Sequence, residues 1–125
     1  MSIAVSSMQR KACKYVWDAW DAAQNVALFV ENKTFDDYVK DIMLRSAVER
    51  QLEIVGEALN QLSRQYPADA ARIPQLPSVV GFRNMLAHQY SDTKNETVWD
   101  VVQQHLPSLS VLLRQILDES PPPGE

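Results

Sequence analysis

The chain is poor in the residues that most often hold metals or shape tight turns. Its 125 residues include one cysteine, two histidines and three glycines. A single thiol excludes an internal disulfide, and one cysteine with two histidines gives no recognisable zinc-ligand spacing, so no cofactor is expected. Because glycine is scarce, long stretches contain neither glycine nor proline, which favours helices over a strand-and-turn fold.

Long hydrophobic runs and excess positive charge are also missing. No apolar run approaches the roughly 18–20 residues that span a bilayer, so no membrane partner is expected. Residues 1–7 lack the pattern of a signal peptide, and a lone Cys13 suits the reducing cytoplasm. The net charge is −4, whereas a protein that binds nucleic acid over its whole surface is usually basic. Any RNA site on this chain must therefore be a local cleft.

What is present indicates one globular domain. Hydrophobic residues make up 46% of the chain and charged residues 22%, both close to globular averages. At this length a single domain can bury a core of its own. We expect the domain to cover residues 8–118, with flexible termini at residues 1–7 and 119–125.

Hydrophobic residues recur at steps of three and four along most of the chain, which predicts an all-α fold. A first helix is expected at roughly residues 8–30 and a second at roughly residues 35–65, with Thr34 as the N-cap of the second. Gly56 lies in the middle of the second helix, where it costs about 1 kcal/mol relative to alanine. Its presence there suggests a close crossing with another helix.

The second half of the chain is punctuated by prolines. A proline-rich loop at residues 67–77 separates the second helix from a third, which Ser78 should cap and which should end near Tyr90. Thr93 begins a capping-box sequence that opens a last helix. The apolar phase of this helix continues through Pro107, which predicts one kinked helix. Together these patterns predict an antiparallel bundle of four to five helices.

One short segment of the third helix concentrates the reactive side chains. Residues 83–90 read Arg-Asn-Met-Leu-Ala-His-Gln-Tyr. At 100° per residue, Arg83 and Tyr90 lie within about 20° of each other, and Asn84 and His88 form the adjacent stripe. Arginine is a permanently charged donor fork suited to phosphate, and histidine changes its protonation near neutral pH.

Arg83 and His88 are the minimum set for cleaving RNA at its own 2′-hydroxyl without a metal. A base removes the 2′-hydroxyl proton, an acid protonates the departing 5′-oxygen, and a cation stabilises the phosphorane. One histidine cannot easily make both proton transfers in one step, whereas two His88 side chains meeting across a two-fold dimer can. This interpretation therefore includes a homodimer.

The spacing alone also fits a structural interpretation, in which Arg83 pairs with a carboxylate and His88 is satisfied at a helix end.

Arg45, a cation on an apolar seam, is expected to pair with Glu49 one turn later; the alternative is that it reaches into the cleft and contacts phosphate. His105 lies on the apolar phase of the last helix and is expected to be packed or half-exposed. Core or dimer contacts are expected for the three tryptophans, Trp17, Trp20 and Trp99; the alternative is that they stack on RNA bases.

The motif resembles the signature of the HEPN superfamily. In it, four residues that begin with the polar Asn84 separate Arg83 from His88, and one residue separates His88 from Tyr90. More closely, the chain resembles the HepT-like toxins that partner minimal nucleotidyltransferases. The resemblance covers roughly residues 10–118 and includes the long-helix sequence Ala-Val-Glu-Arg-Gln-Leu-Glu-Ile-Val-Gly-Glu-Ala at 47–58, Ile73-Pro74, Gly81-Phe82, Trp99 and Leu106-Pro107. Gln75 departs from the tryptophan that often follows Ile-Pro in that family.

The resemblance implies a metal-independent endoribonuclease that is the toxin of a bacterial type VII-like toxin–antitoxin pair. It implies that Arg83 and His88 are catalytic, that Asn84 supports them, and that a cognate nucleotidyltransferase antitoxin transfers AMP from ATP to Tyr90. The added phosphates would neutralise Arg83 and repel RNA. The helical fold, the homodimer and a cleft between protomers are implied in the same way. The expected substrate is RNA, either tRNA or mRNA, and no DNA is expected.

A second interpretation keeps the fold without the catalysis. The chain would then be a non-catalytic helical subunit that binds nucleotide or presents substrate in a nucleotidyltransferase complex. This alternative predicts no RNA cleavage and a stable complex with the transferase. A purely structural dimer module would leave the clustering of Arg83, His88 and Tyr90 unexplained.

Overall fold

The computed structural model describes residues 8–88 and 92–120, and every regular element in these ranges is a helix. The long helices are α1 (Arg10–Val30), α3 (Ile42–Gln65), α5 (Leu76–His88), and a continuous run of α6 (Asp92–Asp100), the π-helical turn η1 (Val101–His105) and α7 (Leu106–Asp118). Two short helices, α2 (Phe35–Lys40) and α4 (Pro67–Ala70), lie in the connections. The predicted all-α bundle is confirmed.

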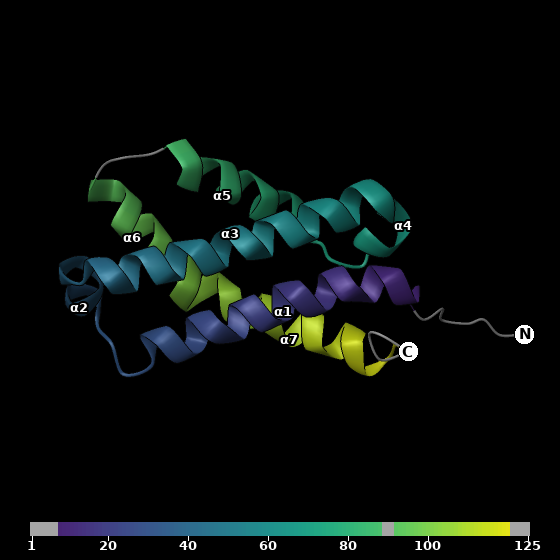
Figure 1. The fold of residues 1–125 in the computed structure, drawn as a ribbon, viewed down its shortest axis with the longest axis horizontal. Helices are drawn as coiled ribbons and strands as arrows, with labels where there is room; N and C mark the ends of the chain where they lie inside the picture. The colour runs from purple at the N-terminus through teal and green to yellow at the C-terminus, as the bar shows by residue number, and fades with distance from the viewer. Residues whose placement is uncertain (1–7, 89–91, 121–125) are drawn as a thin grey trace, which may run out of the picture.

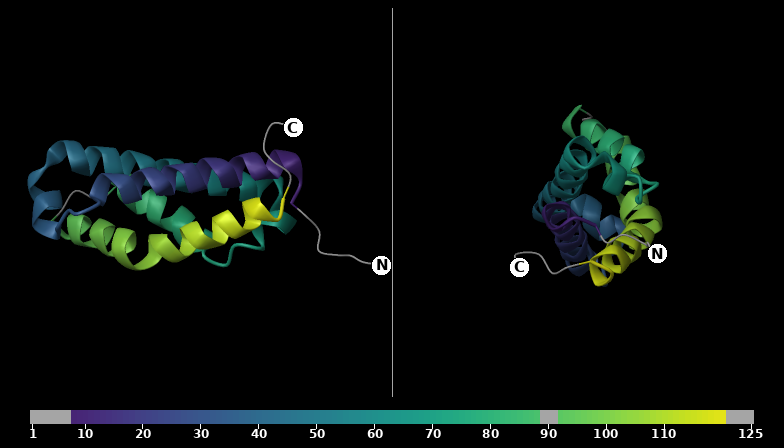
Figure 2. Two further views of the ribbon diagram at one scale, coloured as in Figure 1. Left: turned by 90° about the horizontal axis from the view of Figure 1, so that it is seen from below. Right: turned by 90° about the vertical axis from the view of Figure 1, so that its right-hand side faces the viewer.

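The long helices alternate in direction along the bundle (Figures 1 and 2). α1 and α3 form the central pair, α7 packs against α1, and α5 packs along the outside of α3. The start of α1 and the end of α7 lie at the same end of the molecule. This is the up-and-down arrangement that short connections between antiparallel helices produce. The homodimer stays a prediction.

The core lies between α1, α3 and the α6–α7 run. The buried face of α3 repeats at steps of three and four, through Val48, Leu52, Val55, Leu59 and Leu62. α1 contributes mostly small residues to the same core, namely Ala12, Cys13, Val16, Ala19, Ala22, Ala23 and Val26. Small side chains on one helix let the two backbones approach closely while the leucines of the other fill the space between them.

The predicted second helix is two helices. The chain breaks at Asp41, with φ −112° and ψ 100°, and the Asp41 carboxylate caps α3 by accepting a hydrogen bond of 3.1 Å from the Leu44 N–H. Arg45 spans the break, because its guanidinium donates to the Val39 carbonyl of α2. The expected N-cap at Thr34 is confirmed as the start of α2. Periodicity could not reveal the break, because the apolar phase continues across it.

The third helix starts earlier than its predicted cap. α5 begins at Leu76, two residues before Ser78, and includes Pro77 in its first turn. Proline is well tolerated there, because the first N–H groups of a helix have no intrahelical acceptor. α6 likewise begins at Asp92, so Thr93 lies inside its first turn and not at its cap.

The last run is continuous through Pro107, as predicted, and its irregularity is η1. In this π-helical turn the Leu106 N–H donates to the Val101 carbonyl, five residues back. The wider turn accommodates a proline whose ring would otherwise clash with a carbonyl one α-turn before it. It also shifts the apolar phase by one residue, so Leu106 is buried. His105, predicted to be packed or half-exposed, is exposed instead.

Trp20 and Trp99 are partly buried against the core, whereas Trp17 is exposed. Trp99 packs on the buried Tyr38, with their ring centroids 5.4 Å apart. Trp17 and Trp20 form a pair on α1 at 5.2 Å, and the Arg114 guanidinium lies 5.1 Å from the Trp20 ring. In the part of the chain that the structure describes, no helix combines the length and hydropathy of a membrane span.

Candidate active site

The motif segment lies on α5, which packs against α3 with one face. Leu86 is buried, whereas Asn84 and Ala87 are exposed on the outer side. Arg83 is half-buried, because its stem lies against α3. The motif helix is therefore held at the edge of the bundle and not enclosed by it.

Helix α5 crosses α3 at the point where Arg83 meets Gly56. A Cβ placed on Gly56 would lie 2.7 Å from the Cβ of Arg83 and 3.0 Å from its Cδ. Two such atoms do not approach this closely in proteins, so only glycine permits this helix spacing. The close crossing predicted from Gly56 is confirmed, and the residue that it meets is the motif arginine.

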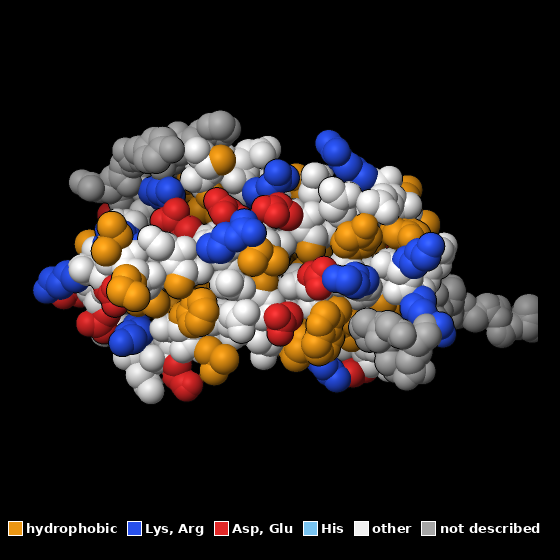
Figure 3. Space-filling view, in the orientation of Figure 1, with side chains coloured by type: hydrophobic (Ala, Val, Ile, Leu, Met, Phe, Trp, Pro, Cys, Tyr) orange, Lys and Arg blue, Asp and Glu red, His pale blue; other side chains and the backbone are white. Residues whose placement is uncertain are grey.

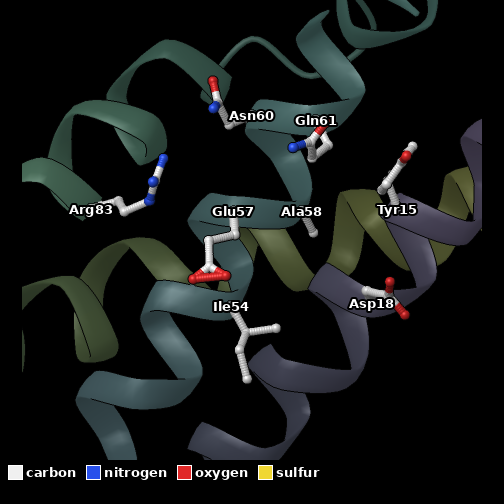
Figure 4. A pocket seen from close by; sticks show the side chains of 8 residues that line it. All are labelled: Tyr15, Asp18, Ile54, Glu57, Ala58, Asn60, Gln61 and Arg83. Atoms are coloured by element: carbon white, nitrogen blue, oxygen red, sulfur yellow. The ribbon is translucent and has the colours of Figure 1, made fainter. Parts of the chain in front are cut away.

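An open hollow of about 460 Å³ lies beside Arg83 (Figure 4). Its walls come from three helices, with Arg83 from α5, Ile54, Glu57, Ala58, Asn60 and Gln61 from α3, and Tyr15 and Asp18 from α1. In Figure 4 the Arg83 side chain extends from α5 toward α3, with Glu57 and Asn60 on either side of it. Tyr15 and Asp18 lie across the hollow on α1.

Sequence reasoning missed most of this lining, because the hollow forms only where three helices meet. One signal was available. Asn60 lies four residues after Gly56, so both occupy the stripe of α3 that faces α5. A polar residue one turn from a glycine crossing is a candidate for lining a site at that crossing.

Arg83 has no carboxylate partner among the described residues. Glu57 lines the same hollow, but its carboxylate lies 3.4 Å from the Arg50 guanidinium. Asp18, across the hollow, pairs with Lys14 at 2.9 Å. The structural interpretation requires an acidic partner for Arg83, and the described part of the chain supplies none. The guanidinium is thus available to an anionic ligand at the edge of the hollow.

The structure describes the other motif residues to different extents. Asn84 follows Arg83 on the exposed side of α5. His88 is the last residue of α5, five residues or about 7.5 Å further along the helix axis. The side chain of His88 and the whole of Tyr90 lie outside the described residues.

Arg45 does not line the hollow. It lies in the first turn of α3, eleven residues or about 16 Å along the helix from Gly56, and donates to the Val39 carbonyl. Glu49, its expected ion-pair partner, pairs instead with Lys94 of α6 at 2.9 Å. Arg45 thus joins α2 to α3, and Glu49 joins α3 to α6.

Two further features concern metal-binding groups and the single thiol. No group of three or more His, Cys, Asp or Glu side chains that could hold a metal occurs in residues 8–88 and 92–120 as described. Burial raises the pKa of the Cys13 thiol, whose Sγ lies 3.7 Å from the Met8 carbonyl in the core, so this thiol is a poor nucleophile. On the face of the molecule in Figure 3, acidic and basic side chains are interspersed.

The family described as Ribonuclease HepT-like matches residues 20–116. The chain belongs to the HepT-like ribonuclease family. The match covers α3 and α5 entirely, and with them Gly56 and the motif, whereas Tyr15 and Asp18 of this HepT-like chain precede it.

Curated relatives carry ribonuclease names. The "probable ribonuclease HepT" of Thermococcus cleftensis is 31% identical over 105 residues, which is 82% of this chain and 92% of the relative. A protein of Caldanaerobacter subterraneus subsp. tengcongensis named as a candidate RNase is 30% identical over 90 residues, 72% of this chain and 80% of the relative. One from Methanocaldococcus jannaschii, similarly named, is 27% identical over 103 residues, 81% and 92% respectively. No solved structure gives a match.

Proposed function

We propose that this HepT-like chain is a metal-independent endoribonuclease in which Arg83 and His88 carry the catalysis. The 2′-oxygen of RNA attacks the adjacent phosphorus while a general base takes its proton. The bond from phosphorus to the 5′-oxygen breaks, and a general acid protonates that oxygen. The products are a 2′,3′-cyclic phosphate and a 5′-hydroxyl. Two His88 side chains, one from each protomer of a homodimer, act as base and acid.

The observation that carries this proposal is the state of Arg83. Its stem is held against Gly56, and its guanidinium has no acidic partner among the described residues. A positioned cation beside an open hollow suits the charge that develops on a phosphorane. Membership of the HepT-like family and the names of the relatives support RNA as the substrate.

The hollow suits a nucleoside better than a second phosphate. Asn60 and Gln61 offer amide donors and acceptors, Tyr15 offers an aromatic ring, and Glu57 and Asp18 are negatively charged. Single-stranded RNA is recognised through unstacked bases that meet aromatic and hydrogen-bonding side chains. The nucleoside next to the scissile phosphate would therefore occupy the hollow, with Arg83 on the phosphate.

We also propose the biological setting that the family resemblance implies. The protein acts in the cytoplasm as the toxin of a type VII-like pair, and a cognate minimal nucleotidyltransferase inactivates it by attaching AMP to Tyr90. Tyr90 follows the end of α5 by two residues in the sequence. Phosphodiesters attached near that end of the motif helix would offset the charge of Arg83 and repel RNA.

The test incubates purified protein, shown by intact mass to be unmodified, with total RNA and with tRNA in EDTA. We expect the wild type to cleave, and Arg83→Ala and His88→Ala each to lose on the order of 10²–10³-fold in rate, because each removes a transition-state group. The matched control is Arg64→Ala. This arginine is exposed near the end of α3 and does not line the hollow, so its loss should leave the rate unchanged.

Cleavage that persists in both motif variants would show that a contaminant or another site is responsible. If unmodified wild type cleaves no RNA but binds a nucleotidyltransferase stably, the non-catalytic subunit becomes the better account.

A further inference from the structure

We infer that Gly56 is a positioning residue for Arg83, an inference that rests on the proposed function. The contact joins the backbone of α3 to three carbons of the Arg83 stem. A Cβ on residue 56 would lie 2.7 Å from the Cβ, 3.2 Å from the Cγ and 3.0 Å from the Cδ of Arg83. Because Gly56 has no side chain, the stem of the catalytic arginine can lie directly against the α3 backbone.

The identity of the closest atom decides what an added methyl group would do. The Cβ of Arg83 is bonded directly to the α5 backbone, so rotating the side chain cannot move it away. α5 must therefore shift relative to α3, and Arg83, Asn84 and His88 must shift with it. Displacements of about 1 Å at a catalytic group can cost on the order of 10²-fold in rate.

Core packing does not explain the close approach. The residue that meets Gly56 is a charged arginine, whose guanidinium continues past the crossing to the hollow. The glycine is unfavourable for a helix interior by about 1 kcal/mol relative to alanine. What the glycine provides is the short distance between α3 and the motif helix.

Gly81 supplies a matched comparison on the motif helix itself. It lies two residues before Arg83 on α5, and a Cβ there would meet nothing within 4 Å. Gly56→Ala and Gly81→Ala are therefore the same chemical change in a helix interior, and both improve helix propensity. They differ in the collision with the Arg83 stem.

The experiment compares the two variants in the full chain, on one RNA substrate in EDTA, well below both unfolding midpoints. We expect Gly81→Ala to stay within about twofold of the wild type, and Gly56→Ala to lose about 10- to 100-fold in kcat with a smaller change in KM. The Arg83 Nε–H signal in a ¹H–¹⁵N spectrum, assigned with Arg83→Lys, should shift in Gly56→Ala and stay in place in Gly81→Ala. A general loss of structure would move signals throughout both helices.

A second measurement needs no glycine variant. In the wild type, the Nε order parameter of Arg83 should be high because its stem is held, whereas that of the exposed Arg64 should be low. Equal mobility of the two arginines, or equal rates for the two glycine variants, would overturn the inference while leaving the nuclease proposal intact. A wild type that cleaves no RNA would overturn the proposed function, and the inference with it.

Discussion

The central pair α1–α3 and the motif helix α5 differ in how much of each helix is buried. α1 and α3 each bury one regular apolar face, although Trp17, Leu28, Ile42 and Met43 on these helices are exposed. Among the side chains of α5 that the structure describes, only Leu76 and Leu86 are buried, while Val79, Phe82 and Arg83 are half-exposed. The positions of α1 and α3 follow from the burial of their apolar faces against each other, whereas α5 packs on one side of the bundle through its contact with α3.

This difference separates the residues that hold the fold from those that meet a substrate. A helix fully enclosed by its neighbours would have no face left for RNA. α5 keeps such a face, and its position depends on Gly56, which belongs to the scaffold. Substitutions in the pair should therefore change stability first, and substitutions on the exposed side of α5 should change activity first.

The largest stability effect should come from Leu59→Ala in α3. Leu59 is fully buried, so we expect a loss of about 2–5 kcal/mol in the free energy of unfolding, from lost burial and the cavity left behind. Arg83→Ala should lower that free energy by about 1 kcal/mol or less, because it removes the packing of the stem on α3 but breaks no ion pair. Denaturant unfolding of both variants measures the contrast. Val111→Ala, at a residue 60% exposed on α7, is the control and should be nearly neutral.

The contrast between the two helices would be contradicted if Arg83→Ala lowered the free energy of unfolding as much as Leu59→Ala does. Arg83 would then be a structural residue, and loss of cleavage in that variant could not be assigned to catalysis.

A smaller effect on stability is expected at the N-cap of α2. The Thr34 hydroxyl accepts from the Asp37 N–H at 3.1 Å, and the Thr34 N–H donates to the Asp37 carboxylate at 2.9 Å. Thr34→Ala should cost about 1 kcal/mol of stability in denaturant unfolding. Thr97→Ala is the control, because this exposed hydroxyl bonds only within α6, to the Thr93 carbonyl.

The same cap lowers the pKa of Asp37, and this makes stability depend on pH. The hydrogen bond from the Thr34 N–H, followed by that with its side chain, holds the pKa of Asp37 below its ordinary value of 3.8. A carboxyl whose folded-state pKa is lowered contributes stability above its unfolded pKa, and this contribution is lost as the pH falls through the folded value. An NMR titration should therefore give Asp37 a low pKa in the wild type and a higher one in Thr34→Ala. Equal values would show that the hydroxyl is not involved.

The smallest effect should come from the ion pair between Glu49 and Lys94, which ties α3 to α6 just after the motif segment. Its Nζ–O distance is 2.9 Å, and the two side chains are 24% and 14% exposed. A double-mutant cycle to alanine should give a coupling of about 0.5–1 kcal/mol. The exposed pair of Lys14 and Asp18 on α1 should give about 0.3–0.5 kcal/mol, since both partners lie on one helix in water.

The scaffold was largely predictable from the sequence, because its helices follow hydrophobic period and capping chemistry. α1, the Thr34 cap and the Gly56 crossing were all expected. The break at Asp41 was not, since the apolar phase continues across it and only the capping carboxylate marks it. The apolar phase was wrong at His105, which is exposed while Leu106 is buried, because a π turn adds a residue without leaving the helix; Leu109 and Ile116 beyond Pro107 are buried as predicted.

The candidate site was predictable only in part. The motif places Arg83, Asn84 and His88 on one helix, which spacing can show. The hollow beside Arg83 needs Tyr15, Asn60 and Gln61 from helices whose mutual packing is tertiary, and beyond the spacing of Gly56 and Asn60 no local pattern indicates it. The location of Arg45 at the α2–α3 junction could not be read from its place on an apolar seam, because the break at Asp41 was not expected.

The most direct test of the central claim identifies the ends of the RNA products that wild type and Arg83→Ala make in EDTA. If Arg83 stabilises the phosphorane formed by 2′-hydroxyl attack, wild type will leave 2′,3′-cyclic phosphate and 5′-hydroxyl ends, and the variant will leave almost none. Products with 3′-hydroxyl and 5′-phosphate ends, or equal amounts of cyclic phosphate from both proteins, would contradict the account.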